Sequence, residues 1–353
     1  MSESRQTLSG VAGRVRVVST EKKHSWVPAF AALAVIWGSS FLFIKVGVEQ
    51  VAPLYVTLFR TATGALALLA TLAVTRERLP RDPRLWGHLA FVALISNVVP
   101  FTLFGYAEDG RVSSVVAGIW NATTPLTTLV IMIAVFPQER ATRQRVSGLL
   151  LGFIGVLVVL GVWEGTGGSS LTGQLLCFAA ATCYAVNLAY VRRFIVGRPE
   201  SGTSIAAAQI SLAALQLAVI APLLAGAPVN PLHLHLRVVA SIVALGALGT
   251  GFAFVLMYRV IRLSSAATAS TVTYLMPIVA AIAGVAVLGE RLHWYEPVGA
   301  MVILFGVAVS QDRLRLRRRT TEPPAAVAAV AAEREVVECG AGASPLVAGG
   351  PVD

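Results

Sequence analysis

Two basic side chains, Lys45 and Arg60, lie inside long apolar stretches of this sequence. A cation at membrane depth costs roughly 2.5–3.5 kcal/mol on insertion scales, so such a residue usually faces a cavity or a partner. At about 1.5 Å of rise per residue, the two positions are expected at similar depth in neighbouring helices. Two like charges at one level favour an anion between them, either Glu49 or the carboxylate or phosphate of a ligand. The alternative is that both extend to the outer interface and pair with Glu49, Glu108 or Asp109.

A second group of candidate side chains precedes two prolines, Pro125 and Pro277. A proline within a membrane span removes a backbone hydrogen bond and kinks the helix, which exposes carbonyl groups to polar ligands. Hydroxyl and amide side chains beside such a kink are expected to line a cavity, although they can also bond back to their own helix. The candidates in these segments are Trp120, Asn121, Thr124, Thr273 and Tyr274.

Further polar and aromatic residues recur at helical spacing in other apolar runs. Trp37 and Ser40 share a helical stripe with Phe41 and Ile44, and a later run carries an aromatic and an amide at a similar spacing. Such a stripe is also compatible with ordinary packing. The remaining predicted binding residues are Trp37, Ser40, Asn97, Tyr184, Asn187 and Tyr258.

The elements that must position these residues are apolar helices. The chain has 353 residues, is 56% hydrophobic and only 13% charged, and has a mean hydropathy of +0.74. Apolar runs of about 18 residues or more indicate membrane-spanning helices, and short loops leave no room for a soluble catalytic domain. The predicted fold is an all-α membrane protein with ten transmembrane helices, at about 28–48, 53–75, 86–107, 112–136, 145–163, 171–193, 204–225, 238–260, 266–288 and 296–310.

The net charge of +10 is distributed unevenly between the two predicted sides of the membrane. With the N-terminus inside, 23 of the 28 lysines and arginines fall in cytosolic segments and three in external loops. This excess predicts that both termini are cytosolic in a cell (plasma or inner) membrane. The basicity therefore indicates topology and a lipid bilayer as partner, and it does not indicate a nucleic acid.

A long segment of the chain occurs twice. Tyr106 and Pro125 are 19 residues apart, as are Tyr258 and Pro277. The same order continues from Glu139-Arg140 to Gly148 and Gly155, and again from Glu290-Arg291 to Gly299 and Gly306. If each copy contains five spans, an odd number, the second copy must be inverted relative to the first. Inverted repeats are typical of secondary transporters, which bind substrate between the two copies.

The repeats divide the chain into five parts. A basic N-terminal tail (1–27) precedes the first repeat (28–163), and a Gly/Ser connector (164–170) leads to the second repeat (171–310). A basic C-terminal tail (311–353) is expected to be cytosolic and disordered.

The same residues resemble a known family. The segment Trp37–Phe41 leading to Lys45, the segment Pro53–Arg60, and the segment Leu275–Arg291 followed by Gly299 and Gly306 are similar to the EamA-domain branch of the drug/metabolite transporter superfamily. The resemblance covers about residues 28–310. It implies two inverted five-helix EamA repeats and a multi-pass carrier for small metabolites. The first copy departs from the pattern by one extra residue and a proline at Pro137.

Signatures of enzymatic chemistry are not found in the sequence. None of the three lysines follows a glycine, so there is no phosphate-binding P-loop and ATP is not the expected driving force. His233 and His235 are only a weak hint of a metal site, because no carboxylate or cysteine accompanies them. We therefore expect no catalytic residue, no metal and no cofactor.

The sequence as a whole predicts a secondary transporter that exports or exchanges small metabolites, such as amino acids, by alternating access. A multidrug efflux carrier is the alternative within transport; a membrane enzyme for lipid-linked substrates and a non-transporting scaffold or sensor are alternatives outside it. Apart from Glu296 at the boundary of the last predicted span, no aspartate or glutamate falls within one, so the buried carboxylate of many proton-coupled carriers is missing. Gly148, Gly152 and Gly155 predict a close-packing helix face, either within the chain or at a homodimer seam.

Overall fold

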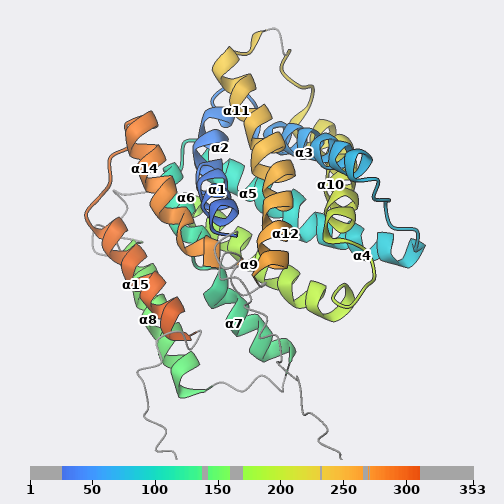
Figure 1. Ribbon diagram of the computed structural model, residues 1–353. Helices are drawn as coiled ribbons and strands as arrows, with labels where there is room; N and C mark the ends of the chain where they lie inside the picture. The colour runs from blue at the N-terminus through green and yellow to red at the C-terminus, as the bar shows by residue number, and fades with distance from the viewer. Residues whose placement is uncertain are drawn as a thin grey trace, which may run out of the picture. The chain divides into compact units, whose positions relative to one another are not determined.

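A computed structural model describes residues 26–136, 142–159, 170–230, 233–264, 269 and 271–310 (Figure 1). All of these residues belong to one compact unit, and within them every regular element is a helix. Most of the predicted N-terminal tail, the C-terminal tail, most of the connector, and the first Glu-Arg pair, Glu139-Arg140, lie outside the described residues.

The first half of the described chain contains eight α-helices, several of them joined end to end within one span. Proline often begins a helix because its missing N–H has no intrahelical partner there; Pro53 and Pro83 do so here. The helices are α1 (Val27–Gly38), α2 (Ser40–Val48), α3 (Pro53–Thr75), α4 (Pro83–Ala93), α5 (Val99–Glu108), α6 (Ser114–Asn121), α7 (Thr124–Val135) and α8 (Arg143–Val159).

The second half follows a similar order of long and interrupted helices. The helices are α9 (Leu171–Phe194), α10 (Gly202–Ala225), α11 (Leu236–Gly246), α12 (Ala253–Leu263), α14 (Met276–Leu288) and α15 (Tyr295–Ser310), with a 3₁₀ turn at Thr271–Tyr274 before α14.

Seven helical segments among the described residues are long and apolar enough to cross a membrane: Val27–Val48, Pro53–Thr75, Pro83–Glu108, Ser114–Val135, Leu171–Phe194, Gly202–Ala225 and Leu236–Leu263. The other three predicted spans correspond to α8, α14 and α15, whose described parts have 17, 13 and 16 residues. The described residues thus form a multi-pass membrane protein with seven candidate spans, whereas hydropathy of the full sequence predicts ten.

Several spans are interrupted at positions that correspond between the two halves. A π-helical turn (Leu94–Val98) separates α4 from α5, and another (Ala247–Phe252) separates α11 from α12. Pro125 lies in the first turn of α7 and Pro277 in the first turn of α14. The two prolines therefore begin new helical segments within their spans, where a missing N–H is tolerated.

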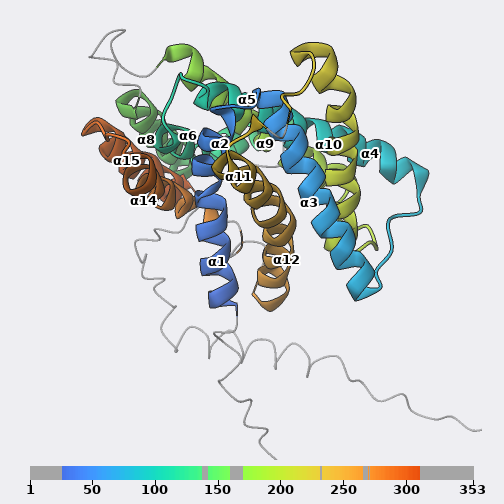
Figure 2. The ribbon, with the colours of Figure 1, turned by 90° about the horizontal axis from the view of Figure 1, so that it is seen from above.

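The α8 and α15 helices pack side by side through glycines (Figures 1 and 2). A Cβ atom placed on Gly155 would lie 2.9 Å from the carbonyl oxygen of Gly299, and one placed on Gly306 would lie 2.7 Å from that of Gly148. Because Gly148 opposes Gly306 while Gly155 opposes Gly299, the two helices run antiparallel. The glycine face that the sequence left open is thus used within the chain.

Both halves contribute to the largest cluster of buried apolar side chains. Phe41 of α2, Phe104 of α5 and Trp120 of α6 belong to it together with Ala180 of α9 and Leu245 of α11. The centre of the described unit is therefore built jointly by the two repeated segments.

Candidate functional site

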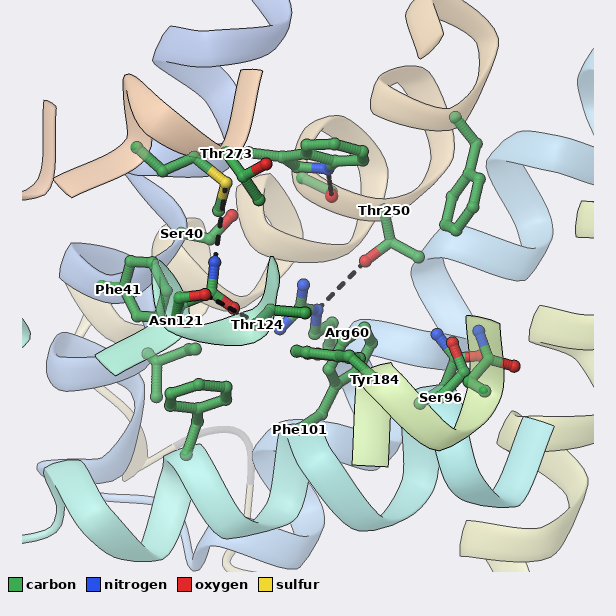
Figure 3. A pocket seen from close by; sticks show the side chains of 18 of the residues that line it. Ser40, Phe41, Arg60, Ser96, Phe101, Asn121, Thr124, Tyr184, Thr250 and Thr273 are labelled. Atoms are coloured by element: carbon green, nitrogen blue, oxygen red, sulfur yellow. Dashed lines mark hydrogen bonds between the residues drawn. The ribbon is translucent and has the colours of Figure 1, made fainter. Parts of the chain in front are cut away.

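A cavity of about 280 Å³ lies among helices of both halves (Figure 3). Its wall is a mixture of aromatic rings, hydroxyl and amide groups and one guanidinium group. The first half contributes Trp37, Ser40, Phe41, Ile44, Arg60, Ser96, Asn97, Phe101, Phe104, Asn121 and Thr124. The second half contributes Tyr184, Asn187, Leu188, Gly249, Thr250, Phe254, Thr273 and Met276.

The interruptions of the helices meet at this cavity. Ser40 follows the break between α1 and α2, Asn97 lies in the first π-helical turn and Thr250 in the second. Thr124 begins α7, and Thr273 lies in the 3₁₀ turn before α14. Irregular backbone within a span is tolerated where it is enclosed by protein or lines a cavity, and π-turns are frequent at functional sites. The local breaks therefore bring polar side chains from five of the ten predicted spans to one place.

Arg60 supplies the positive charge of the cavity wall. Its Nε donates a hydrogen bond of 3.1 Å to Oγ1 of Thr250, and its guanidinium carbon lies 3.5 Å from the centroid of the Phe101 ring (Figure 3). Within the described residues no carboxylate forms an ion pair with this guanidinium. The two terminal nitrogens remain as donors toward the cavity, in the planar arrangement that binds a carboxylate or phosphate through two hydrogen bonds.

The amide side chains of the wall differ in how far they are already used. Asn97 accepts a 2.6 Å hydrogen bond from Gln209, and Nδ2 of Asn121 donates to the sulfur of Met276 at 3.7 Å. Oδ1 of Asn187, in contrast, is buried without a hydrogen-bond partner in the described part of the chain. A buried acceptor without a donor is costly, so this oxygen is suited to receive a hydrogen bond from a ligand.

Thr124 bonds back to its own helix, which is the alternative to cavity lining that the sequence left open for hydroxyl groups. Its Oγ1 donates a 2.7 Å hydrogen bond to the carbonyl oxygen of Asn121, three residues earlier. The hydroxyl proton is therefore engaged locally, while the lone pairs of the oxygen remain at the cavity wall.

Nine of the thirteen predicted binding residues line the cavity, and Lys45, Trp120, Tyr258 and Tyr274 do not. Lys45 is directed toward the end of α5, where its Nζ donates to the carbonyl oxygens of Glu108 at 2.6 Å and Val112 at 3.0 Å. The predicted pair of cations at one anion site is therefore not formed. The reason is that the last carbonyl of α5 and a carbonyl of the loop that follows it provide Lys45 with acceptors.

The three aromatic residues outside the cavity pack elsewhere. Trp120 lies against a second, apolar groove and donates from Nε1 to Gln174 at 3.1 Å. Tyr258 packs near the ring of Phe254, and Tyr274 packs against a separate buried cluster.

One acidic residue lies where the sequence did not place it, and a second caps a helix of the other repeat. Glu108 is the last residue of the candidate span Pro83–Glu108 and is 0% exposed, so the expectation that no acidic residue falls within a span is wrong for this position. Glu290 accepts hydrogen bonds from the Ser114 amide at 2.9 Å and the Ser114 hydroxyl at 2.8 Å, at the N-terminus of α6. Glu290 of the second repeat thus contacts a helix of the first repeat. The neighbouring Arg291 is exposed.

Several lining residues were not predicted, including Phe101, Thr250 and Met276. Phe101 follows Asn97 by one helical turn, which places both on one face. At the repeat offset of 152 residues, Thr250 matches Val98 and Asn97 matches Gly249. The polar residues of the two π-turns are therefore one position apart in the alignment of the repeats. Among the described residues, no three His, Cys, Asp or Glu side chains are placed to hold a metal ion.

Comparisons with known proteins agree with this architecture. Residues 24–161 and 171–310 each match the EamA-like transporter family. The chain is 28% identical to an uncharacterized inner membrane transporter, YedA, of Escherichia coli K12, over 80% of this chain and 89% of that protein. It is 26% identical to the uncharacterized transporter YcxC of Bacillus subtilis, over 85% of this chain and 97% of that protein.

A likeness of fold extends to a protein of known crystal structure. The two superpose with a TM-score of 0.57 at 20% identity, covering 81% of this chain and 96% of the other. At this identity the likeness concerns the fold. Since the two family matches together cover most of the sequence, the chain belongs to the EamA-like transporter family and is a multi-pass membrane protein of the drug/metabolite transporter superfamily.

Proposed function

We propose that the protein is a secondary transporter that exports or exchanges small carboxylate-bearing metabolites, amino acids first among them. The observation that carries this proposal is the central cavity, to which both family-matching segments contribute and in which Arg60 is the cationic group. A volume of about 280 Å³ is close to the lower end of small-molecule sites, which range from about 300 to 1,000 Å³.

The proposed mechanism is alternating access by two inverted five-helix repeats. The antiparallel packing of α8 and α15 supports inversion, because their glycines correspond at the repeat offset and equivalent helices run in opposite directions. The paired π-turns and the paired proline positions support the same correspondence. The charge distribution favours a cell-membrane location with both termini in the cytosol.

The cavity wall offers the proposed substrate two kinds of contact, polar groups and ring surfaces. The terminal nitrogens of Arg60 would bind a carboxylate, and Oδ1 of Asn187 would accept a hydrogen bond from an amino or hydroxyl group. Phe101, Tyr184 and Trp37 offer ring surface to a side chain. A cationic drug is a poorer ligand for this wall, because it would be placed beside an arginine without a neutralising partner.

The proposal is tested by uptake of a labelled amino-acid panel into proteoliposomes that contain the full chain. Arg60→Gln should raise the KM for an anionic or zwitterionic substrate about tenfold to a hundredfold, because a charge-assisted hydrogen bond contributes about 1.5–3 kcal/mol. Arg237→Gln is the matched control, since it removes a surface arginine that pairs with Glu49. Absence of flux for the whole panel, or an unchanged KM in Arg60→Gln, would contradict the proposal.

A further inference from the structure

Glu108 carries a completely buried carboxyl group at the end of α5, and no described residue forms a hydrogen bond with this group. The residue is 0% exposed, and both Oε1 and Oε2 have no partner among the described residues. Burial of a carboxylate without a donor costs far more than burial of the neutral acid, so such a group binds a proton. Ionisable residues within membrane spans are usually functional, so we expect a role for this carboxyl group.

The charged groups around Glu108 form no hydrogen bond with its carboxyl group in the described part of the chain. Lys45 of α2 uses its ammonium on backbone carbonyls, and Arg60 of α3 donates its Nε to Thr250. Cys177, a buried thiol of α9, interacts with Glu108 electrostatically, as does the carboxylate of Glu290 after α14.

No titratable side chain of α6 takes part, because the segment Ser114–Asn121 contains none. The neighbourhood thus holds two cations, Lys45 and Arg60, and a second carboxylate, Glu290, so the count of charges alone does not require a proton on Glu108. The proton is favoured by burial, because no described group donates a hydrogen bond to the carboxyl group.

We propose that Glu108 is a proton-binding site of the carrier, and that its protonation is coupled to transport. The step is a simple equilibrium in which one carboxylate oxygen takes one proton from the aqueous phase and releases it again. This inference rests on the proposed transport function for its coupling, whereas proton binding itself depends only on the environment of Glu108.

The structure provides a route from the proton to the rest of the molecule. Glu290 holds the N-terminus of α6 through Ser114, and ionisation of Glu108 adds a second negative charge in its electrostatic surroundings. Repulsion between the two carboxylates weakens the hold of Glu290 on α6. Phe104 lies one helical turn before Glu108 and lines the cavity, so a movement of this end of α5 reaches the proposed substrate site.

Infrared difference spectroscopy on the reconstituted full chain tests proton binding without any substrate. The carbonyl band of a protonated carboxylic acid is expected near neutral pH in the wild type and should be lost in Glu108→Gln. Glu49→Gln is the matched control, because Glu49 is exposed and pairs with Arg237, and this variant should keep the band.

Identical spectra for the wild type and Glu108→Gln would overturn the proposal. If Glu108→Gln does not accumulate, Glu108→Asp replaces it. The carbonyl band should then be shifted, and an unshifted band would overturn the proposal equally.

Transport measurements separate this inference from the proposed function. For any compound of the panel that is taken up, a pH gradient should change the initial rate in the wild type, and this response should be lost in Glu108→Gln while exchange without a gradient remains. A gradient response retained in Glu108→Gln overturns the coupling. A panel without any flux counts against the proposed function, whereas the infrared result still decides whether Glu108 binds the proton.

Discussion

Replacing Gly306 by alanine should destabilise the protein through the contact between α8 and α15. The added Cβ would lie 2.5 Å from the amide nitrogen of Gly152 and 2.7 Å from the carbonyl oxygen of Gly148. Both neighbours are backbone atoms, so no side-chain rotation relieves the overlap. To reach ordinary contact distances the helices must separate by roughly 1 Å, which forfeits a quarter to a half of the dispersion energy at each affected contact.

Two opposing contributions determine the size of the effect. Overpacking of a close contact costs about 1–3 kcal/mol, and the rigid backbone on the opposite side favours the upper half of this range. Removing a glycine from a helix interior returns about 0.5–1 kcal/mol, because alanine loses less backbone freedom on folding. The net expectation for Gly306→Ala is therefore a loss of about 1–2 kcal/mol of unfolding free energy.

Gly87→Ala is the matched control for this experiment. Gly87 is exposed in the interior of α4, and a Cβ placed on it meets no other atom within 4 Å. This variant should be neutral or up to about 1 kcal/mol more stable. Unfolding of both variants by SDS in mixed micelles, followed by tryptophan fluorescence, gives the two free energies. Equal effects of the two substitutions would refute the close glycine contact.

Two further substitutions test contacts outside the cavity. Glu290→Gln should reduce the unfolding free energy by about 1–2 kcal/mol, because the neutral amide has one acceptor for the Ser114 hydrogen bonds and loses the favourable charge at the helix N-terminus; an unchanged denaturation midpoint would contradict this role. The carboxylate of Asp82 accepts a hydrogen bond from the Arg84 amide, which lowers its pKa. Its stabilisation is therefore present above the unfolded-state pKa of about 3.9 and is lost as the pH falls through the lower folded value. The melting-temperature difference between the wild type and Asp82→Ala should shrink in acid, and a difference independent of pH would count against the argument.

Hydropathy located α3 and α10 well because residues of special backbone conformation mark their ends. Pro53 begins α3, and Arg76, in a left-handed conformation, follows its end; Gly226 follows α10 at positive φ. The family was also predicted, and the matches of both repeats confirm it. The number of spans was not settled in this way, since α14 and α15 are shorter than a full apolar crossing.

The cavity could be anticipated where a residue type itself interrupts a helix. Pro125 and Pro277 indicate that a helix is interrupted. The polar residues near them, Asn121 and Thr273, line the cavity. Pro100 likewise stands just after the first π-turn, but the second π-turn, Ala247–Phe252, contains no proline. Thr250, which orients Arg60, was missed for that reason.

The burial of Glu108 could not be predicted from the sequence of a single helix. In the sequence it stands at the boundary of an apolar run, next to Asp109 and Gly110, and boundary acids are usually solvated. Its burial depends on the packing of α5 against neighbouring helices and on Lys45, which binds the end of α5 through backbone carbonyls. Neither contact is encoded in local spacing.

The separation of Lys45 from Arg60 narrows the class of ligand that the cavity suits. Depth along the helices predicts two cations at one level, which would favour a dianion such as a phosphate ester. In the structure Lys45 is held at the end of α5, so the guanidinium of Arg60 is the cation at the cavity wall. A dianion would leave one negative charge without a partner in a wall of rings, hydroxyls and amides, which is unfavourable in a site of low dielectric constant. We therefore expect a monocarboxylate or a zwitterion to be preferred over a phosphorylated compound, and competition between the two classes in the uptake assay measures that preference.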